Sequence, residues 1–440
     1  MKTINTPPYA SGAHRLLGHT AEFLRSPDTL LDRGAAEHGT MFSLRLPGNH
    51  VVVMAGPEHS HFVFAQPDET LSIGEAYPFF RHMFTSDAYF LASPEEYHRQ
   101  RDIVLPRFQA RQTARYVEVM EREASRLIDS LPAEGTMELT DVLGPLGLRV
   151  AAECFLGSGL SGRITGFFEL FREFSDGMDP LLPGWVPAPH IRRSHRARDR
   201  LRRAVTELLQ ARRDRPLEEP DFLQELAHAH YANGEPVTDS VRVSLALMLA
   251  WVGHETTASH LCWALIDLLR HPAELDRARQ EQAEFFRDGD VPLTLPLVRR
   301  LEHLDRAAHE SERLHPVTNG VVRKVMHPLE YAGHTLPKGS TVLLTPRLTH
   351  RLPEVFPDPD VFRPDRFLDD PKAVRHLIGF GGGLHRCLGK NVAYLEIKIT
   401  VTRMLQRLEL ELLDPDPQPE AGQKNNWPRK PCRVRYRRRD

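Results

Sequence analysis

The sequence predicts a mainly α protein with small β-sheets, folded as a single domain over residues 1–440. Three observations predict this class. Apolar residues recur with a helical period through most of the chain, and strand-like runs are confined to two short parts. One helix, from about Asp239 to Arg270, is long enough to cross a whole domain. No internal repeat or low-complexity linker divides the chain.

The strand-like parts lie at about residues 35–60 and 330–346. In the first part, two apolar runs flank Pro47, Gly48 and Asn49, which is the pattern of a β-hairpin. The second part contains alternating runs between Gly333 and Pro346. We expect these two parts to form the β-rich portion of the domain.

The helical core is expected at about residues 95–320 and 390–410. Within it, Thr238 or Asp239 can cap the long helix, and His271-Pro272 ends it. At about 1.5 Å per residue this helix spans roughly 45 Å. Its first half is apolar on most sides, so the helix should be buried.

Composition excludes some classes of function. Lys and Arg (57) nearly balance Asp and Glu (59), for a formal net charge of −2, so nothing global favours nucleic acid or an anionic membrane as a partner. The four cysteines are widely spaced without CxxC pairs, which fits a reducing cytoplasm. The N-terminus does not resemble a signal peptide, and the longest apolar run, Val243 to Val252, is too short to span a membrane.

The segment from Phe380 to Gly389, FGGGLHRCLG, is the strongest chemical signal. Its glycines allow sharp turns and close approach to a flat ligand. A helical pattern starts at Lys390, so Cys387 should lie near a helix N-terminus, where amides stabilise a thiolate. A thiolate on haem iron favours cleavage of the O–O bond. The alternatives are a buried apolar cysteine, a dinucleotide loop that lacks its third glycine, or zinc held by His376, His385 and Cys387.

This segment resembles the haem-binding motif of the cytochrome P450 superfamily, FGxGxHxCxG, with every fixed position present. The resemblance implies the P450 fold, with haem b (iron protoporphyrin IX) between the long central helix and the helix after the cysteine. It implies that Cys387 binds the iron and that His385 lies near a haem propionate. Phe380, Gly381 and Gly389 would complete the loop around the ligand.

Glu310 and Arg313 are spaced i, i+3 on a helical stretch and share one face. A surface ion pair is the ordinary explanation for such spacing. Followed by Leu314-His315-Pro316, the pair also resembles the ExxR motif of the same family. The resemblance implies a buried structural network, to which Arg366 of the Phe362–Phe367 segment contributes.

The segment Val252 to Thr257 places a glycine and two threonines inside the long helix, where neither residue type is favoured. Close packing against another helix is one explanation. The other is a notch at Gly253 where dioxygen binds, with Glu255 and Thr256 relaying protons to it. A zinc-protease HExxH motif is excluded because position 258 is Ala. The segment resembles the oxygen-activation motif of the P450 family.

Two basic residues are expected beside the haem. The segment with Tyr97 and Arg101 resembles the family's WxxxR helix, with Tyr97 in the place of Trp. The resemblance to the family implies that Arg101, and Arg323 further along the chain, pair with the haem propionates. A solvated basic helix face is the alternative explanation.

Further segments resemble the sterol 14α-demethylase branch of the family: Ala76–Phe79, Leu182–Pro187 with Arg192-Arg193, and Val434–Arg439. Three later positions of the cavity motif differ from that branch, which carries Pro, Gly and Asp where this chain has His82, Thr85 and Leu91. The branch also carries His where this chain has Glu255. The expected substrate contacts are Tyr77, Phe79, Phe80, Phe84, Val252 and Val321.

The resemblance implies a monooxygenase that hydroxylates a bulky apolar small molecule, terpenoid or sterol-like, or another natural product. It would use O2 and two electrons from outside, since no flavin or iron–sulfur part is visible in the sequence. The expected donors are a ferredoxin and its ferredoxin reductase, and the expected location is the cytoplasm. Two alternatives remain, a haem-thiolate peroxygenase or isomerase and a non-catalytic haem-binding protein.

Overall fold

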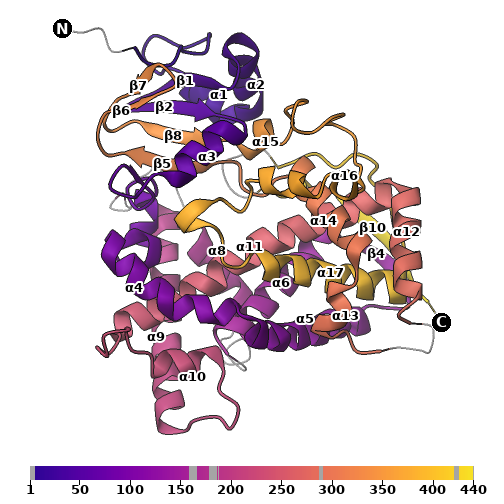
Figure 1. The fold of residues 1–440 in the computed structure, drawn as a ribbon. Helices are drawn as coiled ribbons and strands as arrows, with labels where there is room; N and C mark the ends of the chain where they lie inside the picture. The colour runs from indigo at the N-terminus through magenta and orange to yellow at the C-terminus, as the bar shows by residue number, and fades with distance from the viewer. Residues whose placement is uncertain are drawn as a thin grey trace.

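A single long helix, α11 (Asp239–Arg270), runs through the middle of the molecule (Figure 1). The Thr238 side chain caps its start by accepting a hydrogen bond from the Val241 amide at 3.3 Å. His271 and Pro272 end it, as expected from the sequence. Most of its side chains are buried, because other helices surround it.

The structure is a computed structural model that describes residues 5–157, 166–177, 186, 188–286, 291–420 and 426–439, without the side chains of Phe79, His82 and Ala110.

Three helices packed on α11 form the centre of the helical part. They are α6 (Leu139–Phe155), α14 (Glu302–Leu314) and α17 (Lys390–Arg407). The approach of α6 to α11 is close at Gly147, where an added Cβ would lie 3.0 Å from both the Ala258 Cβ and the His254 carbonyl oxygen.

The remaining helices surround this centre. The α-helices are α1 (Thr20–Arg25), α2 (Pro27–His38), α3 (Pro57–Ala65), α4 (Pro94–Val104), α5 (Ala110–Ser130), α8 (Phe167–Ser175), α9 (Pro189–Asp214), α10 (Phe222–Ala227), α12 (Pro272–Ala283), α13 (Leu295–Arg299), α15 (Pro346–Thr349) and α16 (Arg366–Asp369). The 3-10 turns are η1 (Pro78–His82), η2 (Tyr89–Leu91), η3 (Leu105–Phe108), η4 (Pro371–His376) and η5 (Gly383–His385).

A five-stranded sheet with the order β1-β2-β8-β5-β3 forms the β-rich part. Its strands are β1 (Met41–Leu46), β2 (Asn49–Met54), β3 (Leu71–Ser72), β5 (Val321–Val325) and β8 (Thr341–Leu344). The expected hairpin is present, since β1 pairs antiparallel with β2, and Gly48 turns with a φ of 70°. The parallel pairing of β2 with β8 joins two segments that are almost 300 residues apart.

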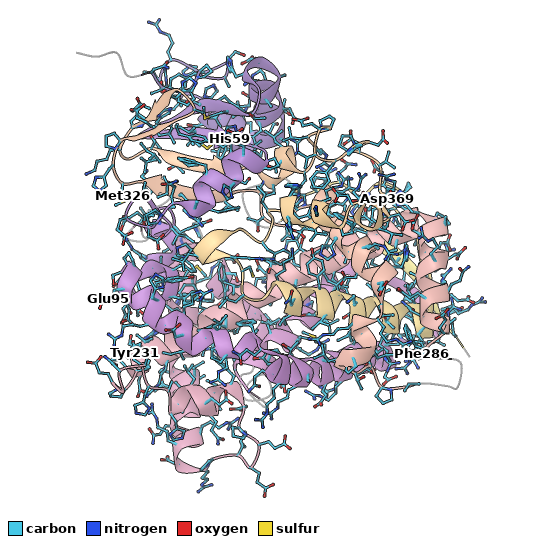
Figure 2. The ribbon with its side chains drawn as sticks, viewed as in Figure 1. His59, Glu95, Tyr231, Phe286, Met326 and Asp369 are labelled. Carbon is cyan, nitrogen blue, oxygen red and sulfur yellow. The ribbon has the colours of Figure 1, made fainter. Side chains whose placement is uncertain are left out.

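Two smaller sheets complete the fold. One has the order β4-β10-β9, with β4 (Glu134–Glu138), β9 (Leu408–Leu412) and β10 (Arg433–Arg438), and the other pairs β6 (Leu329–Tyr331) with β7 (His334–Leu336). Figure 2 shows the β-rich part around His59 and Met326 at the upper left, and the helical part toward Phe286 and Asp369 on the right. The predicted class, mainly α with small sheets, is confirmed. Among the described residues, no helix combines the length and apolar character needed to cross a bilayer.

Candidate functional site

The cysteine loop, Phe380–Gly389, lies against the start of α17. The Cys387 amide donates to the Phe380 carbonyl oxygen at 2.9 Å, which closes the loop on itself. Burial raises the pKa of the Cys387 thiol, while backbone NH groups of Gly389 and Lys390 and the Lys390 ammonium act in the opposite direction. These donors at a helix N-terminus favour the thiolate over the thiol.

Two glycines of the cysteine loop are required by packing against α3. A Cβ on Gly382 would lie 2.3 Å from the Phe64 ring, and one on Gly383 would lie 2.1 Å from the Phe64 carbonyl oxygen. Gly383 also has a φ of 62°, in the left-handed region. The glycines therefore press the back of the loop onto α3, which leaves Cys387 on the opposite side, facing a cavity.

This main cavity has a volume of about 360 Å³, within the range of small-molecule sites. Cys387 forms part of its wall, and a segment of α11 forms another part. The lining is largely apolar and aromatic, and includes Tyr77, Phe90, Met248, Leu249, Val252 and Val321. Such a cavity excludes water from whatever binds beside the cysteine.

One face of α11 borders the main cavity through Val252, Gly253, Thr256 and Thr257. The Thr256 hydroxyl donates to the Val252 carbonyl oxygen at 2.8 Å, four residues back in the helix. An added Cβ on Gly253 would be in ordinary contact with Phe155, at 3.4 Å, so close packing does not by itself require glycine there.

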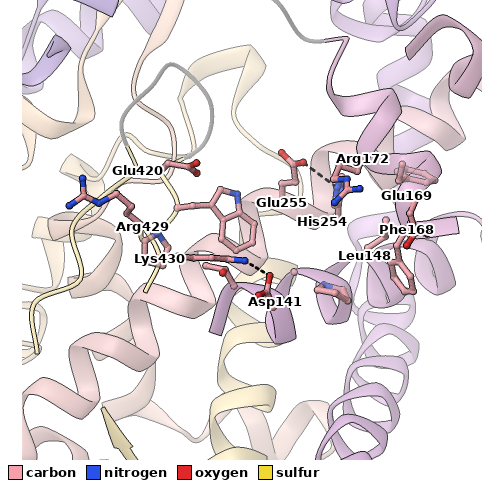
Figure 3. A pocket seen from close by; sticks show the side chains of 16 residues that line it. Asp141, Leu148, Phe168, Glu169, Arg172, His254, Glu255, Glu420, Arg429 and Lys430 are labelled. Atoms are coloured by element: carbon pink, nitrogen blue, oxygen red, sulfur yellow. Dashed lines mark hydrogen bonds and ion pairs between the residues drawn. The ribbon is translucent and has the colours of Figure 1, made fainter. Parts of the chain in front are cut away.

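Glu255 and His254 lie on another face of α11 and line a second cavity of about 620 Å³ (Figure 3). The second cavity is bordered by α6, α8 and the segment from Trp427 to Lys430. The Glu255 carboxylate lies 3.7 Å from His254 Nε2. The structure therefore does not place Glu255 and Thr256 in one cavity, because neighbouring residues of a helix point about 100° apart.

A basic and aromatic cluster borders the main cavity on its β5 and α4 side. Arg323 is 4% exposed, and burial lowers the pKa of its guanidinium. Among the described residues, neither Arg323 nor Arg101 has a carboxylate within ion-pair distance, and the buried Nε of Arg101 has no hydrogen-bond partner. The Tyr97 hydroxyl donates to the Leu384 carbonyl oxygen at 3.3 Å.

His385 also lines the main cavity, but one side of its ring is already occupied. Its Nε2 lies 2.8 and 2.9 Å from the two carboxylate oxygens of Asp68. Tyr97 packs on the same ring at a centroid distance of 4.5 Å. The His385 Nδ1 atom is therefore the ring nitrogen that can bind a ligand.

The Glu310 network, formed by Glu310, Arg313 and Arg366, lies outside the main cavity and is almost fully buried. Glu310 accepts hydrogen bonds from Arg313 at 2.8 and 2.9 Å and from Arg366 Nε at 2.8 Å. The remaining guanidinium groups donate to backbone carbonyls, including those of His350 and Val361. This arrangement is a structural support, since every charge in it has a partner.

The predicted substrate contacts separate into three groups. Tyr77, Val252 and Val321 line the main cavity. Phe80 and Phe84 do not line it, because their rings pack against Trp251 at 5.3 and 5.8 Å in the core. The Phe79 side chain, and residues 182–185 and 187 of the branch-like loop, lie outside the described residues.

Four residues at the site were not predicted from sequence patterns, namely Asp68, Tyr89, Glu312 and Glu396. Tyr89 has a φ of 44°, unusual for a residue other than glycine, and lines the main cavity. Glu312 and Glu396 are buried carboxyls on its wall. For Glu312 a signal existed, since an acidic residue inside a mostly buried helix is uncommon.

These residues fit a haem. Cys387 offers a sulfur to iron, and the apolar walls suit a flat porphyrin. The unsatisfied Arg101 Nε and the buried Arg323 are donors that two propionate carboxylates would satisfy. No cluster of three or more His, Cys, Asp or Glu side chains suited to a metal ion is found in the described ranges.

Comparison with known proteins identifies the family. A model described as Cytochrome P450 matches residues 7–434. The sterol 14alpha-demethylase of Mycolicibacterium vanbaalenii is 29% identical, over 100% of this chain and 99% of its own length, and the lanosterol 14-alpha demethylase of Bos taurus is 28% identical, over 99% and 88%. The structure of retinoic acid bound cyanobacterial CYP120A1 superposes with a TM-score of 0.88 at 26% identity, over 99% of this chain and 100% of that one. The chain belongs to the cytochrome P450 family and is a monooxygenase that uses protoporphyrin IX haem.

Proposed function

We propose that this P450 hydroxylates a bulky apolar small molecule, either a terpenoid or a sterol-like compound. The main support is the apolar wall that faces Cys387 across the main cavity, formed by Met248, Leu249, Val252 and Val321. Apolar walls of this kind bind substrates by excluding water rather than by specific polar contacts. The names of the relatives support a polycyclic substrate.

Four polar side chains in or beside the main cavity have a proposed role toward the cofactor. When bound, haem supplies the iron at which dioxygen is activated. Cys387 is the proposed iron ligand, held by the Gly389 and Lys390 amides. Arg323, Arg101 and the free side of His385 would orient the propionates.

Protons are proposed to cross α11 from the second cavity to the main cavity. Glu255 borders the second cavity, where its carboxylate can take a proton from solvent. The Thr256 hydroxyl faces the main cavity and can pass a proton on, because it both accepts and donates. Since the two side chains line different cavities, the transfer needs a rotation of Glu255 or bridging water.

Electrons are proposed to come from a ferredoxin and its reductase. A one-electron carrier suits an enzyme that must be reduced twice in each turnover. Turnover with hydrogen peroxide but not with a ferredoxin system would contradict this proposal and favour a peroxygenase. The cytoplasmic location stays a prediction.

A spectral titration tests the substrate class. Sterols and terpenoids are added to the ferric holoprotein, and the Soret shift that reports displacement of iron-bound water is followed. Val252→Phe, which fills the main cavity, is expected to weaken binding at least tenfold. Val291→Phe changes another exposed valine, one that does not line the main cavity, and should leave binding unchanged. If no sterol or terpenoid shifts the spectrum, this substrate class is wrong.

A coupling measurement tests the proton path. Thr256→Ala is expected to divert most consumed electrons to peroxide, because the last hydroxyl before the main cavity is lost. The matched control is Thr206→Ala on α9, whose hydroxyl makes the same backbone bond, to the Arg202 carbonyl at 2.8 Å. Equal coupling in Thr256→Ala and the unaltered enzyme would exclude the relay.

A further inference from the structure

Glu312 is a buried carboxylate on α14 that lies close to the Glu310 network in sequence but faces elsewhere. It is 2% exposed and lines the main cavity with Cys387. Residues two apart on a helix point about 200° away from each other. Glu310 therefore meets the two arginines, while Glu312 faces the cysteine loop and α17.

One oxygen of Glu312 has a single strong partner and the other has none. The Tyr394 hydroxyl of α17 donates to Glu312 Oε2. Burial, with the nearby Glu312 carboxylate, raises the pKa of Tyr394 well above its usual value, so the tyrosine keeps its proton and remains the donor. Oε1 is buried without any hydrogen-bond partner. It lies against Gly379, the residue just before the cysteine loop, where an added Cβ would be 2.8 Å away.

Among the described residues, no imidazole forms an ion pair with Glu312. His309, one turn earlier on α14 and stacked on Tyr394 at 4.2 Å, pairs with Asp305 instead. His260 of α11 and His350 at the end of α15 are two further imidazoles on which the Glu312 charge acts. Burial lowers the pKa of His260, and it lowers the pKa of His350 to about 4. Both rings are therefore neutral at neutral pH.

The cationic side chains near Glu312 interact with other groups. Arg313 is bound to both oxygens of Glu310. The Lys390 ammonium lies over the rings of Phe380 and Tyr394, 5.6 Å from each centroid. Among the described residues, no cation lies within ion-pair distance of Glu312.

We propose that Glu312 holds an uncompensated negative charge beside the start of the cysteine loop and thereby lowers the reduction potential of the haem iron. Adding an electron to the haem is opposed by a fixed negative charge, and the opposition is stronger in a buried site than in water. The potential of a haem depends on such charges as well as on its axial ligand. This inference depends on the proposed haem site.

The test is the ferric/ferrous midpoint potential of the holoprotein, measured by spectroelectrochemistry at pH 6.5. Glu312→Gln and Glu312→Leu both remove the charge, and both should shift the potential to more positive values. The expected change is about tenfold in the reduction equilibrium, or about 59 mV for one electron. Glu312→Asp keeps the charge and should return the potential close to that of the unaltered protein.

Glu396→Gln is the matched control, because Glu396 is the other buried carboxyl noted on the wall of the main cavity. Burial raises the pKa of Glu396 to about 8, so at pH 6.5 it is already neutral. The substitution then removes no charge, and the potential should stay unchanged. An equal shift in Glu396→Gln and Glu312→Gln would overturn the proposal, since it would show that charge is not the cause.

The spectrum of the reduced protein under carbon monoxide separates this inference from the proposed haem site. A wild-type spectrum without the far-red Soret band of thiolate ligation would remove the foundation of both. A normal band together with an unchanged potential in Glu312→Gln and Glu312→Leu would overturn only the role of Glu312. If one of these two variants fails to take up haem, the other measures the same effect.

Discussion

The Glu310 network and the main cavity are two buried polar regions with opposite hydrogen-bonding states. In the Glu310 network, one carboxylate and two guanidinium groups satisfy one another and nearby carbonyls. On the wall of the main cavity, one oxygen each of Glu312 and Glu396 has no partner, and Arg101 Nε, on α4 beside the cavity, has none either. Native proteins rarely leave buried polar groups unsatisfied without a reason.

The difference separates residues that hold the fold from residues that serve the site. A satisfied network stabilises the folded chain whether or not a cofactor is present. A buried polar group without a partner costs stability, which Arg101 would recover when a carboxylate binds, while the proposed charge of Glu312 stays uncompensated. The four predictions below test this distinction, each at a different residue.

Cys387→Ala should abolish monooxygenase activity, because the thiolate proposed to bind the iron is lost. The far-red Soret band of the reduced protein under carbon monoxide should disappear with it. Cys262→Ala alters a cysteine buried within α11 and should keep both activity and band. Retained turnover in Cys387→Ala would rule out the thiolate role.

Glu310→Ala should destabilise the folded protein by about 3–5 kcal/mol, because it leaves two buried guanidinium groups without their carboxylate. Denaturant unfolding of the holoprotein measures the change. Glu302→Ala alters an exposed residue at the start of the same helix and should change stability by less than about 0.5 kcal/mol. Similar small effects in both variants would show that the network does not hold the fold.

Glu396→Gln should alter how stability depends on pH. The pKa of Glu396 is raised to about 8 by burial, against about 4.3 in an unfolded chain. Between these values the folded state keeps a proton that the unfolded state loses, so stability decreases as pH rises. Removing this group should stabilise the protein at pH 9 by about 5 kcal/mol relative to its change at pH 4. The melting temperatures of the variant and of the unaltered protein are measured across this pH range. If the two curves of melting temperature against pH run parallel, this prediction is wrong.

Arg323→Gln should weaken haem retention about tenfold, the cost of roughly one charge-assisted hydrogen bond. The rate of haem loss to an excess of a haem-scavenging apoprotein measures the effect. The matched control is Lys324→Gln, since successive residues of β5 point to opposite faces and Lys324 bonds to Asn49 and Thr341 instead. Equal rates of haem loss in both variants would show that the Arg323 guanidinium does not contribute to haem retention.

Much of the fold was predictable from local patterns. The hairpin around Gly48 and the limits of the helix from Asp239 to Arg270 follow from turn and cap residues, which act over a few positions. The cysteine loop could also be recognised, because its glycines and its following helix are contiguous in sequence. The pairing of β2 with β8 could not be predicted from the sequence, because no local pattern specifies a partner strand so far along the chain.

The candidate site was less predictable, because distances across the fold decide it. Phe80 and Phe84 are aromatic residues in a cavity-like motif, yet packing against Trp251 takes them into the core. Glu255 is adjacent to Thr256 in sequence, yet helix geometry gives it another cavity. Asp68 meets His385 only because the segment after α3 returns beside the cysteine loop.

The available chemical groups and the positions of the main helices follow from the order of residues along the chain, since short-range periodicity and caps set them. Which buried polar groups find hydrogen-bond partners follows instead from how the chain packs. That outcome depends on neighbours from distant segments, as for Glu310 and Glu312, which are two residues apart and have different surroundings. Burial and partnership are properties of the packed chain, so they cannot be read from either glutamate alone.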